Sequence, residues 1–374
     1  MSSPPALPPA IRGRGAAENP TNRFERLAYV PEPPQSWEER QSWAEREESE
    51  SPKLPLTVYL RDPARTVLAS NDSPDINFAA SLNPYRGCEH GCSYCYARPT
   101  HEYLGFSSGL DFETRILVKE AAPELLRREL SAKRWRPQVV GMCGVTDAYQ
   151  PIERRLELTR RCLQVFAEFR NPVQVITKNG LVARDRDVLA ELAEHDAASV
   201  CLSITSLDPK LLRVMEPRAS HPQQRLAAVK ALAEAGVPVG VMVAPVIPGL
   251  TDHEMPAILA AAREAGASYA GHIVLRLPRN VKELFSAWLE RHHPDRKDKV
   301  LNRLRAMRGG RLDDPRFGTR MKGSGVYATQ IHDLFDLAYR KAGFDPAAAP
   351  PVLSTAAFLR SIAVSSSSPG PRYR

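Results

Sequence analysis

Apolar residues in the middle of the chain form short continuous runs, and the segments between the later runs repeat apolar residues every three or four positions. Continuous runs predict strands buried on both faces, and the repeating segments predict amphipathic helices. The predicted strands comprise residues 76–82, 112–118, 138–145, 173–177, 199–204, 237–246 and 269–275. The predicted helices between them comprise residues 151–169, 184–194, 222–235 and 252–265.

Strands that alternate with helices of this length predict βα units, which build a parallel sheet with right-handed crossovers. We therefore expect an α/β fold whose core covers residues 74–276. Residues 1–73, rich in Pro, Glu, Arg and Ser, are expected to form a flexible N-terminal arm. The rest is expected to be a helical extension at 277–363, with helices near 281–289, 296–307 and 327–342, and a disordered tail at 364–374.

The 374 residues carry a formal net charge of +8, and 40 of the 51 basic residues are arginine. An arginine excess together with 33 prolines is typical of a GC-rich genome, so the charge only modestly favours a nucleic-acid partner over a small acidic one. The sequence has no run of 18 uncharged apolar residues and no signal-peptide pattern. We therefore expect a cytoplasmic protein without a membrane partner; the oligomeric state stays open.

Three cysteines with the spacing C-x₃-C-x₂-C are the strongest chemical signal in the chain: Cys88, Cys92 and Cys95. Three thiolates leave an iron–sulfur cluster one protein ligand short, so one iron can bind and activate another molecule. Gly87 and Gly91 suit such a loop, because a chain that wraps a cluster needs left-handed conformations and a close backbone approach to the sulfides. The spacing therefore predicts a catalytic cluster.

A zinc knuckle is the alternative interpretation, with a fourth ligand from His90, His101 or a distant cysteine. Zinc sites usually combine one pair of cysteines with a second pair of Cys or His, and the sequence has no second pair. Cys143, Cys162 and Cys201 are isolated in apolar stretches, where a small buried thiol is expected. The cluster is therefore preferred over zinc.

Polar groups follow several predicted strands, and in a parallel barrel the carboxyl ends of the strands meet on one rim. These groups are Thr146 and Asp147, Lys178, Ser203, and the backbone near Ala244. A carboxylate, an ammonium group and hydroxyls on one rim suit a zwitterionic amino acid joined to a ribose. Each alone has another interpretation: Asp147 as a helix cap, Lys178 as an exposed turn residue, and Ser203 as a satisfied strand hydroxyl.

The cysteine spacing, with an aromatic residue at Tyr94 before the third cysteine, resembles the radical S-adenosylmethionine (SAM) superfamily. The runs 146–149, 176–178 and 203–205 are most similar to its spore photoproduct lyase-like branch, over about residues 76–290. The resemblance implies an incomplete parallel (β/α)₆ barrel of the TIM type, with the cysteine loop after the first strand. It also implies a [4Fe–4S] cluster that reductively cleaves SAM to a 5′-deoxyadenosyl radical, with a ferredoxin or flavodoxin as electron donor.

By the same resemblance the three cysteines hold the cluster, and the other site residues hold SAM. Thr146 and Asp147 would hold its amine side, Lys178 its carboxylate and Ser203 its ribose. The backbone near Ala244 and the ring of Tyr94 or Tyr96 would cover its adenine.

Two features depart from the family pattern. The Gly-Gly-Glu run that the superfamily often shows after its second strand is replaced by Thr146-Asp147, and the fifth strand reads Val239-Gly240-Val241 without the usual acid. Spore photoproduct lyases also use a cysteine as hydrogen donor at the place of Gly144, whereas Cys143 stands one residue earlier. Strand alternation directs Cys143 to the opposite face, so we expect it to contribute packing rather than chemistry.

Three functions remain. The first is a radical SAM enzyme that acts on DNA or another nucleic acid, and the second is one that acts on a small molecule or a peptide. The third is a non-catalytic zinc or nucleic-acid-binding module. The basic, glycine-rich residues 309–325 could close an open barrel or bind phosphate, or could be a solvated loop.

Overall fold

The computed structural model describes residues 7–25, 55–142, 144–347 and 350–360. Its main sheet has seven strands in the order β10-β9-β8-β7-β6-β3-β2. The strands are β2 (Leu68–Ser70), β3 (Ala80–Leu82), β6 (Val140–Met142), β7 (Val173–Thr177), β8 (Ala198–Ser203), β9 (Val239–Val246) and β10 (Tyr269–Val274). A second sheet has the order β1-β5-β4, formed by β1 (Val58–Arg61), β5 (Arg115–Val118) and β4 (Tyr85–Arg86).

In the main sheet the strands β3, β6, β7, β8, β9 and β10 pair in parallel, and β2 runs antiparallel to β3. This order is the one that consecutive right-handed βα units produce. It confirms the expected incomplete (β/α)₆ barrel. β8 is buried along its whole length, as its continuous apolar run predicts.

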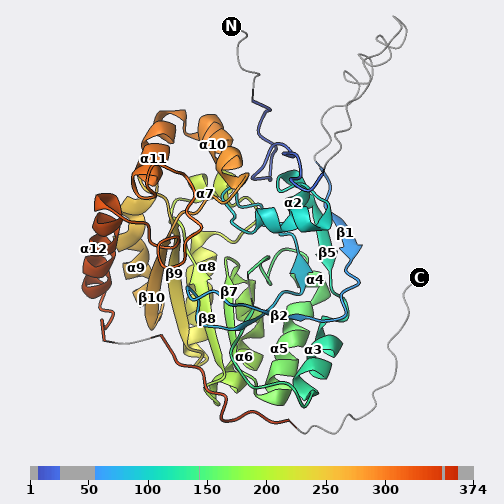
Figure 1. The fold of residues 1–374 in the computed structure, drawn as a ribbon. Coiled ribbons are helices and arrows are strands. Elements are labelled where there is room, and N and C mark those ends of the chain that lie inside the picture. Colours follow the sequence, from blue (N-terminus) through green and yellow to red (C-terminus); the bar gives the residue numbers. More distant parts are fainter. Residues whose placement is uncertain (1–6, 26–54, 143, 348–349, 361–374) are drawn as a thin grey trace, which may run out of the picture.

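Helices cover the outside of the barrel (Figure 1). In chain order these elements are η1 (Arg98–Leu104), α2 (Leu110–Thr114), α3 (Ala122–Ser131), α4 (Glu153–Leu156), α5 (Leu158–Phe169), η2 (Gly180–Asp185), α6 (Arg186–Ala193), α7 (Pro209–Met215), α8 (Pro222–Glu234), η3 (Asp252–Glu254), α9 (Met255–Glu264), α10 (Val281–His292), α11 (Pro294–Ala306) and α12 (Val326–Lys341). α10 and α11 lie at one end of the barrel, as does α2 (Figure 1). The three helices predicted within 277–363 are therefore present. Among the described residues, every helix is too short or too polar to cross a membrane.

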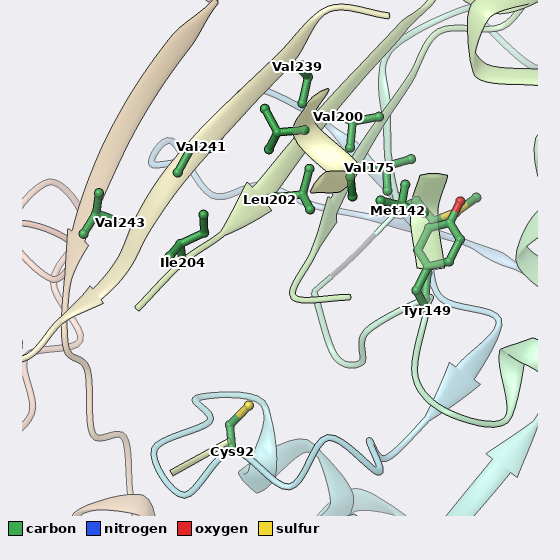
Figure 2. Close-up of a cluster of buried hydrophobic side chains, with 14 of the residues drawn as sticks. Cys92, Met142, Tyr149, Val175, Val200, Leu202, Ile204, Val239, Val241 and Val243 are labelled. Atoms are coloured by element: carbon green, nitrogen blue, oxygen red, sulfur yellow. The ribbon is translucent and has the colours of Figure 1, made fainter. Parts of the chain in front are cut away.

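The core lies between the sheet and its covering helices and fills the barrel with aliphatic side chains. Figure 2 shows part of it, with Val175, Leu202 and Val241 from β7, β8 and β9 in one cluster. Cys92 belongs to the same cluster, but it is carried by a loop rather than by a strand (Figure 2). The packed strands therefore form a rigid core, and the candidate functional residues lie on the loops that follow the strands.

Two predicted elements differ in the structure. The predicted strand 112–118 begins as helix α2, and only β5 is extended; β5 belongs to the second sheet, beside the barrel sheet. The predicted helix 151–169 is interrupted at Glu157, whose backbone is left-handed with φ 51°. One left-handed residue interrupts the series of backbone hydrogen bonds within the helix, so α4 and α5 are separate helices.

The N-terminal segment also differs from the expected flexible arm. Residues 7–25 lie against η1 and α2, where Asn22 donates hydrogen bonds to the carbonyls of Glu102 and Phe106 at 2.9 and 3.0 Å. Within 55–73, β1 and β2 are paired strands. These contacts could not be predicted from the hydrophobic pattern, because they are made largely by backbone and side-chain hydrogen bonds. The remainder of the arm and the tail 364–374 lie outside the described residues.

Residues 308–323, called here the closing loop, connect the two edges of the barrel sheet. At one edge, the Val274 amide at the end of β10 donates to the Met321 carbonyl at 2.9 Å. At the other, Asp75, before β3, accepts from the Gly318 amide at 2.7 Å and pairs with Arg320. Of the alternatives for 309–325, the structure thus shows a loop that closes the open barrel.

Candidate active site at the mouth of the barrel

The cysteine loop begins directly after β4 and ends where η1 starts. Cys88 and Cys92 are each 7% exposed, and Cys95 is half-buried. The Cys95 amide donates to the Cys92 carbonyl at 3.2 Å, which forms a tight turn between the last two thiols. Gly91 has the left-handed φ of 66° that the sequence predicted for this loop.

Burial and the Glu216 carboxylate raise the pKa of Cys92 well above its ordinary value, and burial and Cys88 raise the pKa of Cys95 to about 11. These thiols therefore influence one another electrostatically and become good ligands only when a cation replaces their protons.

No three His, Cys, Asp or Glu side chains in the described part of the chain are gathered closely enough to hold one metal ion. A cluster of four irons occupies more space than one ion, so its thiolate ligands stand farther apart than those of zinc. The three-thiol donor set and the loop conformation fit such a cluster.

A buried ion pair anchors the loop from behind. Arg98 donates to the Cys92 carbonyl from Nε at 3.0 Å and from Nη2 at 2.8 Å, and it pairs with Glu113. Glu113 also accepts from the amides of Gly15 and Ala16, at 3.0 and 2.8 Å. Both charged side chains are completely buried, so the carboxylate that compensates Arg98 also attaches the N-terminal segment to the loop.

The N-terminal segment lies directly on the cysteine loop. A Cβ atom at Gly15 would stand 1.7 Å from the carbonyl oxygen of Gly91, a distance that no side chain can occupy. Arg14 extends the contact by donating to the Glu113 carbonyl at 3.0 Å. Sequence reasoning missed this anchor, because a glycine that permits close approach looks the same in sequence as a glycine in a flexible arm.

Thr146 and Gln150 fasten the other end of the cysteine loop. The Thr146 hydroxyl donates to the Gly87 carbonyl at 2.6 Å, and Gln150 accepts from the Glu89 amide at 3.0 Å. The residues after β6 therefore hold the loop in place. The predicted role of Thr146 on the SAM amine stays a prediction.

Asp147 is surrounded by donors at the end of β7. It accepts from the Thr177 hydroxyl at 2.7 Å, the Lys178 amide at 2.8 Å and the Tyr149 amide at 2.9 Å, and His90 lies 3.4 Å away. Burial alone would raise the pKa of Asp147, but His90 and these hydrogen bonds lower it to about 2. The carboxylate is thus held ionised and joins three segments; its role on the SAM amine also stays a prediction.

A buried polar network lies beside Cys92. The Lys178 ammonium group donates to the Ala244 carbonyl at 2.8 Å and to the Thr205 hydroxyl at 3.1 Å, and it lies 3.3 Å from Glu216. The Tyr94 hydroxyl donates to Glu216, and its ring lies 5.6 Å below the ammonium group. Three predicted site residues, Tyr94, Lys178 and Ala244, therefore come together here.

Arg225 completes this network from α8. It pairs with Glu216 and donates to the Ser203 carbonyl at 2.8 Å, which fixes the end of β8. Burial alone would raise the pKa of Glu216. The positive charges of Arg225 and Lys178 outweigh this effect and hold the pKa of the carboxyl well below its ordinary range. Sequence reasoning missed Glu216 and Arg225; the signal was an acid at the end of the apolar run 211–216.

Tyr96 is another predicted site residue. It is 52% exposed, and its ring lies 5.6 Å from the Arg276 guanidinium. Cys143 falls outside the described residues. Tyr94 is therefore the better placed of the two tyrosines considered for adenine.

A model of the Radical SAM superfamily matches residues 82–262, which include the cysteine loop and β6 to β9. An uncharacterised protein of Mycobacterium tuberculosis is 40% identical over 220 residues, 58% of this chain and 65% of that protein. One of Methanocaldococcus jannaschii is 31% identical over 174 residues, 46% of this chain and 62% of that protein. The chain thus spans just under two thirds of the length of these relatives.

Solved structures of spore photoproduct lyase have the same fold. The lyase complexed with dinucleoside spore photoproduct matches 82% of this chain and 91% of its own, with a TM-score of 0.55 at 15% identity. A variant with bound AdoMet and dinucleoside spore photoproduct matches 77% and 79%, also at 0.55 and 15%. At this identity the likeness shows the fold alone.

Proposed function

We propose that this chain, whose residues 82–262 match the Radical SAM superfamily, cleaves SAM reductively on a [4Fe–4S] cluster held by Cys88, Cys92 and Cys95. The observation that carries the proposal is a loop with three thiols and no fourth, close to the half-buried ammonium group of Lys178 at the mouth of a parallel barrel. When bound, the cluster supplies the electron that splits SAM into methionine and a 5′-deoxyadenosyl radical.

The network around Lys178 supports a binding role for this residue. Its ammonium group donates to Ala244 and Thr205 and lies beside Glu216, so the positive charge is held at the end of the strands. In our proposal the carboxylate of SAM takes the place of a neutral acceptor, because a charge-assisted bond is the stronger one. Glu216 and Arg225 would keep Lys178 in position.

The other SAM contacts follow the same rim. We assign the amine side to Thr146 and Asp147, with Asp147 also orienting the Lys178 backbone through its 2.8 Å hydrogen bond. Ser203 is assigned to the ribose, and Ala244 with Tyr94 to the adenine. Tyr96 is assigned to the substrate side, since its exposed ring lies 5.6 Å from the Arg276 guanidinium.

For the substrate we propose a nucleic acid. The support is the fold shared with spore photoproduct lyase, whose solved structures hold a dinucleoside photoproduct, together with the net charge of +8. A small molecule or a peptide is the alternative, and it predicts no salt-dependent binding to DNA. We further propose a ferredoxin or flavodoxin as electron donor and a reducing, cytoplasmic setting, which suits free thiolates.

Anaerobic reconstitution tests the proposal. The protein, supplied with iron and sulfide, reduced and incubated with SAM, should accumulate 5′-deoxyadenosine and methionine in equal amounts. Cys201→Ala is the matched control, because Cys201 is equally buried but lies within β8. Stoichiometric zinc without iron and no SAM cleavage would instead support the non-catalytic module.

A further inference from the structure

Arg276, two residues after β10, is half-buried and forms no ion pair with any described residue. Its Nε atom is buried and has no hydrogen-bond partner, and its Nη1 atom reaches only the Met321 sulfur, at 3.7 Å. No carboxylate in the described residues lies within ion-pair distance of it, although Asp75 and Asp313 act on it from farther away. Burying a guanidinium in this state is costly, so the arrangement suits a ligand that is an anion.

Neighbouring arginines add to the positive charge. Arg308 is 1% exposed and donates to the carbonyls of Leu275 and Arg320, at 2.6 and 3.2 Å, which positions the residues on either side of Arg276. Its Nε atom also lacks a partner. Arg320 is neutralised by Asp75, whereas Asp313 acts on Arg276 and Arg308 only from farther away, outside ion-pair distance.

Aromatic rings flank this charge on the open side. The Arg276 guanidinium lies 5.6 Å from the centre of the Tyr96 ring, and Tyr96 follows the third cysteine of the loop. The Phe317 ring, 53% exposed, lies 4.3 Å from the Arg320 guanidinium. Cations interleaved with exposed rings are how proteins hold single nucleotides, with phosphate on arginine and the base stacked on a ring.

We propose that Arg276 binds a phosphate group of the substrate, and that the adjacent Tyr96 ring stacks on the attached nucleoside unit. The phosphate belongs to a free nucleotide or to a single strand, two sources of the same chemistry. The inference rests on the proposed function and extends it, because it places the substrate beside Cys95. The closing loop then has two roles, since it completes the barrel and supplies Arg308 and Arg320.

The test is a fluorescence anisotropy titration of the full-length protein with a labelled single-stranded 12-mer of deoxythymidine at several salt concentrations. Arg276→Gln should weaken binding roughly tenfold or more and reduce the salt dependence by about one phosphate contact. Arg316→Gln is the matched control on the same loop, because Arg316 is exposed and paired with Asp314. It should bind within about twofold of the wild type. Arg276→Lys keeps the charge but loses the two parallel donors of the guanidinium group, so its affinity for the 12-mer should lie between those of the two glutamine variants. It replaces Arg276→Gln in the test if that variant fails to fold.

Competition identifies the source of the phosphate. Displacement of the 12-mer by thymidine 5′-monophosphate but not by thymidine supports a free nucleotide, and binding of the 12-mer alone supports a strand. Equal affinity of the Arg276→Gln and Arg316→Gln proteins would overturn the proposal. The proposal would also be overturned if the wild type bound an acidic peptide but no oligonucleotide, and if the Arg276→Gln protein no longer bound that peptide. The titration needs neither SAM nor reductant, so its failure is distinct from a failure of SAM cleavage in the wild type.

Discussion

The mouth of the barrel has two sides that differ in how their buried cationic groups are paired. On the cysteine side, residues 85–98 with their anchors, Arg98 pairs with Glu113 and donates to the Cys92 carbonyl, although the buried Glu89 Oε2 and Ser93 Oγ atoms have no hydrogen-bond partner. The closing-loop side, residues 274–276 and 308–323, leaves buried donors of Arg276 and Arg308 without partners. A site for a resident cofactor requires a rigid support, whereas a site for an incoming substrate keeps polar groups ready for it.

The largest effect that we expect is on the cysteine side itself. Cys92→Ala should reduce bound iron and sulfide to background and abolish the visible absorption, because two thiolates cannot hold the cluster. Cys162→Ala and Cys201→Ala, both buried outside the loop, should keep nearly full iron. Full iron loading of the Cys92→Ala protein would show that the cysteine side does not hold the cofactor.

The anchor behind the loop gives the next largest effect. Glu113→Gln leaves Arg98 buried without a counter-charge and turns an amide donor toward the amides of Gly15 or Ala16. We expect a loss of about 3–5 kcal/mol in the free energy of unfolding of the cluster-free protein, measured by urea titration. Glu168→Gln is the control: its pair with Arg127 is exposed, so its loss should be under about 1 kcal/mol. Similar losses in the two proteins would contradict a rigid cysteine side.

A smaller effect is expected on SAM binding. Lys178→Ala and Asp147→Ala should each weaken SAM affinity by about 1.5–3 kcal/mol, measured by anaerobic calorimetry, because each removes a charge-assisted contact. Both proteins should keep their cluster, and Lys210→Ala, an exposed lysine on α7, should bind SAM as the wild type does. Unchanged affinity in both variants would place the cofactor on other strand ends.

The smallest effect is predicted for Cys143. From strand alternation in the sequence we predict that its thiol faces away from the site, so Cys143→Ala should cost little stability and leave the products of the reaction unchanged. Product analysis by mass spectrometry checks this. Side products that accumulate while SAM cleavage persists would assign Cys143 the role of hydrogen donor and revive a lyase-type mechanism.

The parallel barrel was predictable because its signals are local. A continuous apolar run such as residues 173–177 can be buried on both faces only inside a covered sheet, and β7 has those bounds. Segment 112–118 was harder to assign, because short apolar runs suit a helix and a strand equally well. The start of this segment became α2, where Glu113 is needed to face Arg98.

The same division applies to the site. The amino-acid sequence by itself determined the three thiols, their spacing and the order of the βα units, since each of these depends only on neighbours along the chain. Only the tertiary structure decided that Glu216 lies beside Lys178, that Gly15 contacts Gly91 and that Arg276 stands next to Tyr96. These contacts join residues far apart in sequence, and the energy of a buried charge depends on the distance to its partner, which no local pattern encodes.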